Sequence, residues 1–84
     1  MTPDVVQVRP LQDFCLLAEF STGEWRWMDM KPYLAYPAFA PLSKGGLFQK
    51  AYIALGAVAW SDQIDLSPDT QYCLGTAVIK PSDA

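Results

Sequence analysis

The chain has 84 residues, contains no histidine and has only two cysteines. Without histidine, neither a Ser/His/Asp triad nor a Cys/His pair can form, and a zinc site would lack a common ligand. Cys15 and Cys73 do not form a CxxC pair, and no secretory signal precedes them. We therefore expect two buried free thiols that pack as small hydrophobic groups, in preference to a disulfide.

Positive charge is also scarce. Six basic residues are scattered singly among nine acidic ones, which gives a net charge of −3. Nucleic acids and anionic membranes are bound by clustered basic residues, so we expect this chain to bind neither directly. There is no glycine-rich phosphate loop, and we expect no cofactor. No apolar run is long enough to span a membrane, and the N-terminus lacks a leader pattern, so we expect a cytoplasmic protein.

Hydrophobic residues are plentiful, at 51% of the chain, and 13% of residues are aromatic. This composition predicts a folded core and leaves apolar surface for a partner or a second copy. The length predicts a single domain over residues 1–84 with a small core.

The clearest local pattern is a β-hairpin over residues 14–30, in which two apolar runs flank a Ser-Thr-Gly turn. A two-residue turn would require a positive φ at Thr22, which a β-branched residue resists. We therefore predict a three-residue loop in which only Gly23 is left-handed. That register places Ala18 opposite Arg26.

The same register gives the hairpin apolar groups on both faces. Leu16 lies opposite Met28 on the face that we expect to pack on short helices. The other face holds the candidate interface residues, which are Leu17, Trp25 and Trp27. Aromatic residues are enriched at the centres of protein interfaces, so this face predicts either a partner surface or additional core.

Further elements follow from turn and cap signals. An edge strand is predicted at residues 5–8 and a further edge strand at residues 76–79. A second hairpin that turns at Gly56 is predicted at residues 52–60. Trp60 is expected in the core. The sequence predicts an α+β fold: an antiparallel sheet of about four to five strands, built from two hairpins, with short helices packed on one face.

Several residues are expected to shape turns and helix ends. Ser67 is predicted to be an N-cap, and Pro68 suits the first turn of a helix that Gly75 can end. The residues assigned to turns and caps are Gly23, Asp29, Asp65, Ser67 and Pro68. A competing interpretation groups Asp62, Asp65 and Asp69 as a carboxylate or metal site, although aspartate also favours turns and helix starts.

Part of the sequence resembles a bacterial family known as domain-of-unknown-function family 2442. The resemblance rests on Phe-Ser-Thr-Gly-Glu at residues 20–24, Met-Asp-Met at 28–30, and Trp60 followed by Ile-Asp-Leu-Ser-Pro-Asp at 64–69. It covers about residues 5–73, with an extension at 74–84. It implies a small α+β domain, with relatives fused to helix-turn-helix segments or encoded beside small toxin-like proteins, and with no known catalytic residues.

These observations predict a non-enzymatic protein-interaction or regulatory module that self-associates or binds a protein partner. An antitoxin-like partner of a small bacterial protein is one form of it. The alternatives are a small carboxylate- or metal-dependent hydrolase using Asp62, Asp65 and Asp69, and an accessory subunit of a DNA-binding regulator.

Overall fold

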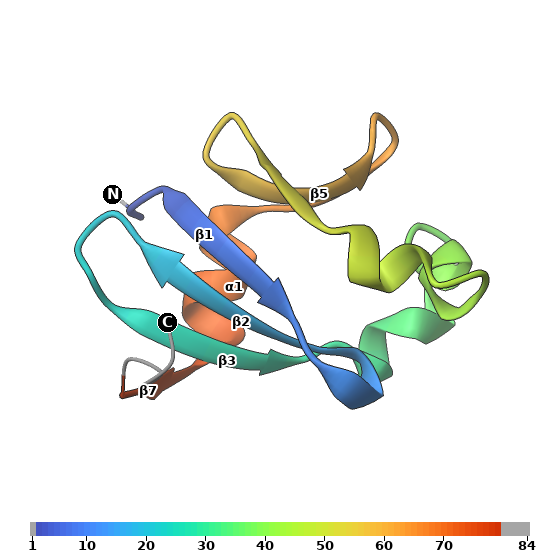
Figure 1. The fold of residues 1–84 in the computed structure, drawn as a ribbon, viewed down its shortest axis with the longest axis horizontal. Helices are drawn as coiled ribbons and strands as arrows, with labels where there is room; N and C mark the ends of the chain where they lie inside the picture. The colour runs from blue at the N-terminus through green and yellow to red at the C-terminus, as the bar shows by residue number, and fades with distance from the viewer. Residues whose placement is uncertain (1, 80–84) are drawn as a thin grey trace.

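The computed structural model describes residues 2–79, which form two antiparallel sheets, one α-helix and several 3₁₀ turns (Figure 1). The large sheet has the strand order β1-β2-β3-β7 and the small sheet the order β4-β5-β6. The large sheet contains β1 (Val5–Pro10), β2 (Cys15–Phe20), β3 (Trp25–Asp29) and β7 (Thr76–Val78). The small sheet contains β4 (Tyr52–Ala54), β5 (Ala57–Ser61) and β6 (Ile64–Leu66). The helical elements are η1 (Gln12–Phe14), η2 (Lys31–Ala35), η3 (Ala40–Ser43), η4 (Leu47–Lys50) and α1 (Pro68–Leu74).

The hairpin formed by β2 and β3 has the predicted register. Ala18 lies opposite Arg26, and Leu16 lies opposite Met28. Gly23 has a φ of 89°, and its N–H donates to the carbonyl of Phe20 at 2.8 Å. The three-residue turn with a left-handed glycine is therefore confirmed.

Helix α1 begins and ends at the predicted residues. The Ser67 hydroxyl accepts the backbone N–H of Asp69 at 3.1 Å, and Pro68 occupies the first turn. At the other end, the Gly75 N–H donates to the carbonyl of Gln71 at 2.9 Å. A Cβ at position 75 would lie 2.6 Å from that oxygen, so glycine lets the chain turn closely from α1 toward β3.

The α+β class is confirmed, but the expectation of one sheet containing both hairpins is wrong. β4 and β5 pair with each other and with β6 in a separate sheet. The neighbouring edge strand β1 has an irregular register between Val5 and Gln7, and Pro10 has no N–H to donate. β1 touches the second hairpin through a hydrogen bond from the Val5 N–H to the Gly56 carbonyl, at 2.8 Å.

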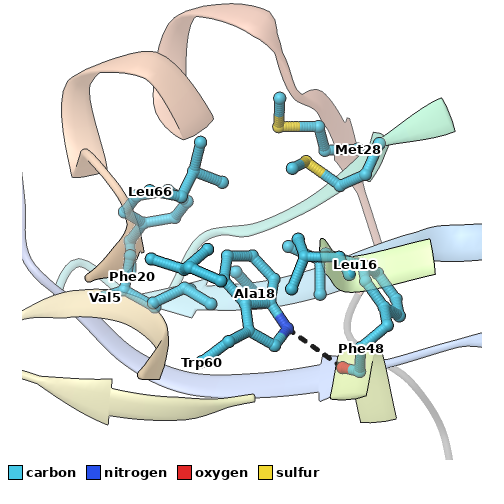
Figure 2. Packing of buried hydrophobic residues seen from close by; sticks show 12 residues of the cluster. Val5, Leu16, Ala18, Phe20, Met28, Phe48, Trp60 and Leu66 are labelled. Carbon is cyan, nitrogen blue, oxygen red and sulfur yellow. Dashed lines mark hydrogen bonds between the residues drawn. The ribbon is translucent and has the colours of Figure 1, made fainter. Parts of the chain in front are cut away.

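The core lies between the two sheets and α1 (Figures 1 and 2). Trp60 is buried in it, as predicted, and its indole N–H donates to the Phe48 carbonyl at 3.0 Å. The Trp60 and Phe48 rings are stacked, with their centroids 5.8 Å apart. From α1, the Tyr72 ring meets Phe20 edge to face at 5.1 Å. The two sheets and the helix therefore share one hydrophobic core.

Replacing the helix cap should destabilise the fold measurably. We expect Ser67→Ala to lower the free energy of unfolding by about 1 kcal/mol, because the Asp69 N–H loses its acceptor. Urea denaturation followed by circular dichroism measures the change. The matched control is Ser43→Ala, an exposed hydroxyl that donates only to the Ala40 carbonyl, with an expected effect within about 0.5 kcal/mol. Equal effects of the two variants would contradict the capping role.

Candidate functional site

One face of the large sheet packs against the core, and no helix or strand of residues 2–79 lies over the other. In Figure 1, α1 passes behind β1 and β2, so the view is onto this second face, which we call the open face. The strand pairings assign its side chains, because partners directly across a ladder point to the same side. Its central side chains are Gln7, Arg9, Leu17, Glu19, Trp25, Trp27, Thr76 and Val78.

Trp27 is the most prominent apolar group at the middle of the open face. It lies on β3 between Leu17 of β2 and Thr76 of β7. Trp27 is 38% exposed, although it occupies an inner strand of the sheet. Leu17 beside it is half-buried. An exposed indole with an apolar neighbour and polar groups around it is the pattern found at the centre of protein interfaces.

Trp25 differs from Trp27, although both point to the same side. Trp25 is only 2% exposed and lies between Glu19 of β2 and Val78 of β7. The guanidinium carbon of Arg9 lies 5.7 Å from the centre of its ring, within the range of a cation–π contact. Of the three candidate interface residues, Trp27 is therefore exposed and Leu17 is half-buried. Trp25 is already covered in the folded chain.

Sequence reasoning missed the two residues that help to cover Trp25. Arg9 was assigned no role, and Val78 was expected only in an edge strand. The run at residues 76–79 gave the one usable signal, because it predicted an edge strand where the structure has β7 paired with β3. The antiparallel partner of that strand could not be identified from so short a run.

Arg26 points away from the open face, toward α1. Its Nη1 donates to the carbonyls of Tyr72 and Gly75 at 2.9 and 3.2 Å, and its guanidinium carbon lies 4.1 Å from the Tyr72 ring centre. Its Nη2 lies 2.7 Å from Glu24. This arginine therefore holds α1 against β3 and supplies no positive charge to the open face.

Asp29 has the structural role that was predicted for it. Its Oδ1 accepts the backbone N–H of Lys31 at 2.9 Å, at the start of η2, and lies 3.3 Å from Lys31 Nζ. The backbone hydrogen bond, followed by the side-chain bond and the charge of Lys31, holds the pKa of Asp29 below its ordinary value. Hydrogen bonding to Asp29 also raises the pKa of Lys31.

The two cysteines lie in different environments. Cys15 is a buried free thiol on β2, and burial raises its pKa, which disfavours the reactive thiolate. Cys73 is also free but is exposed, so the expectation of two buried thiols is wrong for this residue. On α1, the fully buried position belongs to Gln71, and Cys73 lies on the solvent side.

The three aspartates of the competing interpretation do not line one common site. Asp62 and Asp65 line a hollow on the small sheet, while Asp69 lies in the first turn of α1 and does not line it. Asp65 is in β6 opposite Ala59, so its assignment to a turn is wrong: pairing with β5 extends this short segment. Among residues 2–79, no group of three His, Cys, Asp or Glu side chains is placed to hold a metal ion.

The fold and this surface define a class: a small α+β domain with two antiparallel sheets and an aromatic group on an uncovered sheet face. The chain belongs to the family described as "Protein of unknown function (DUF2442)", whose model matches residues 5–73. The match includes six of the seven strands formed by residues 2–79 and leaves out β7. No curated protein and no solved structure matches the chain. Within the described residues, no helix is long and apolar enough to cross a membrane.

The contrast between the tryptophans is directly measurable. Trp25 and Trp60 are buried and Trp27 is exposed. We expect Trp27→Phe to remove most of the tryptophan fluorescence that acrylamide quenches easily, and Trp25→Phe and Trp60→Phe to leave it in place. A Trp25→Phe variant that removes as much accessible fluorescence as Trp27→Phe would contradict the arrangement.

The Asp29 contact predicts a pH dependence. A lowered pKa in the folded chain means that Asp29 stabilises the fold above its unfolded pKa, and that this stability is lost as the pH falls through the lowered value. We expect an NMR titration of its carboxyl carbon to give a midpoint below 3.8. Lys31→Met should raise the midpoint only in part, because the backbone N–H of residue 31 still donates. Lys44→Met is the control and should not change it; full recovery to 3.8 in Lys31→Met would contradict the account.

Proposed function

We propose that this chain is a non-enzymatic protein-binding module whose partner docks on the open face of the large sheet. The observation that carries the proposal is Trp27, an indole exposed at the middle of a four-stranded sheet face. Tryptophan is among the residues that contribute most binding energy when they are buried at the centre of an interface.

The surroundings of Trp27 support a protein partner. Leu17 and Val78 add apolar surface on the two neighbouring strands, and Glu19 and Thr76 add polar groups. An apolar centre with polar groups around it favours a protein surface over a nucleic acid, which would require positive charge beside the aromatic ring. Among the central side chains of the open face the one basic group is Arg9, which lies against the Trp25 ring. Arg26 is directed into the opposite side of the sheet, so this face carries no cluster of positive charge.

Within this proposal, the partner is a second copy of the chain or a small protein that the chain regulates, as the antitoxin-like interpretation suggests. Both follow from the same surface and can be separated by the mass of the complex. The role of accessory subunit to a DNA-binding regulator is a further form of the same binding function, in which the partner carries the DNA contacts.

Site-specific crosslinking in the cells that produce the protein tests the proposal. The photoreactive residue p-benzoylphenylalanine replaces Trp27 in one variant and Tyr36, an exposed aromatic residue that follows η2, in the control. We expect a discrete adduct from position 27 that is absent from position 36. An adduct of twice the chain mass identifies self-association, and another mass identifies a different partner.

With the partner identified, Trp27→Ala should weaken the complex by about 2 kcal/mol or more, while Tyr36→Ala should leave it unchanged. Isothermal titration calorimetry, or sedimentation for a self-association, measures both. No adduct at position 27, or the same adducts from both positions, would overturn the proposal.

A further inference from the structure

The small sheet carries a second candidate surface, on the side turned away from the core. Its outward side chains surround a hollow of about 330 Å³. Ala54, Ala57 and Ala59 leave it shallow, because alanine is the smallest side chain that a strand position can carry short of glycine. The hollow is lined by Tyr52, Ala54, Leu55, Ala57, Ala59, Ser61, Asp62 and Asp65.

Leu55 lies at one end of the hollow, and its backbone conformation is unfavourable for a leucine. It is fully exposed at the tip of the hairpin between β4 and β5, with a φ of 53°. The two-residue turn of Leu55 and Gly56 requires positive φ at both positions, where asparagine or aspartate before glycine is the usual choice. A leucine here is unfavourable both for its backbone and for its contact with water, and burial against another molecule would offset the second cost.

The other end of the hollow carries negative charge. Asp62 and Asp65 are exposed, and among residues 2–79 neither carboxylate accepts a hydrogen bond or forms an ion pair. No lysine or arginine of the described chain lines the hollow. A ligand that brings its own positive charge would complement a hollow with three alanines along it and two carboxylates at one end.

We propose that this hollow binds a segment of another protein in which an arginine or lysine side chain neighbours an apolar residue. The aliphatic stem of the basic side chain lies over the alanines, and its charged end meets Asp62 and Asp65. The apolar neighbour packs against Leu55 and Tyr52. A second copy of this chain is a poor match because its net charge is −3, and nucleic acid is repelled by both carboxylates.

The test is an NMR titration of the ¹⁵N-labelled chain with the acetylated peptide amide Leu-Arg-Leu-Arg-Leu. We expect saturable shifts of backbone amides within residues 52–66. The same peptide with glutamate in place of arginine should cause none. The double variant Asp62→Asn with Asp65→Asn should bind about threefold or more weakly, as expected for the loss of exposed ion pairs.

Two further variants separate binding from folding and from the open face. Leu55→Asn suits the positive φ, so its thermal midpoint should stay the same or rise while its affinity for the peptide falls. Trp27→Ala should leave affinity for the peptide unchanged, so a failure here is distinct from a failure of the open-face proposal. The inference is overturned if residues 52–66 do not shift, if the aspartate variant binds equally well, or if the polyamine spermidine binds as tightly as the peptide.

Discussion

The register of the hairpin between β2 and β3 is the constraint on which the rest of the structure depends. The loop that ends at Gly23 is closed by the Phe20 N–H, which donates to the Glu24 carbonyl at 2.8 Å. This closure fixes which side of the sheet each later residue faces. Because side chains alternate along a strand, a slip of one residue would move Trp27 into the core and Met28 into solvent.

The division between the two faces of that hairpin also separates folding from binding. The inner face contacts the small sheet and α1, and Arg26 joins α1 to β3 through its hydrogen bonds to the Tyr72 and Gly75 carbonyls. The core thus uses one side of each sheet. The outer sides are left for other contacts, with exposed Trp27 on the large sheet and exposed Leu55 on the small one.

Local chemistry determined which features could be predicted from the sequence. The turn at Gly23 and the cap at Ser67 depend on residues within a few positions, and both were predicted correctly. The strand β6 is extended because it pairs with β5, and local turn preferences do not report that pairing. Asp65 was therefore assigned to a turn. The contact of Arg9 with Trp25 joins two strands, β1 and β3, that do not pair with each other. Asp62 could not be placed beside the same hollow as Asp65 without the second sheet.

The central claim is that one face of the hairpin between β2 and β3 packs in the chain's own core and that the other face binds a partner. Hydroxyl-radical footprinting read by mass spectrometry tests it, by comparing oxidation of the tryptophans in the purified chain with that in intact cells. The account predicts that Trp27 is readily oxidised when the chain is purified and protected in cells, while Trp25 and Trp60 are protected in both. Equal oxidation of Trp27 in the two settings would contradict it.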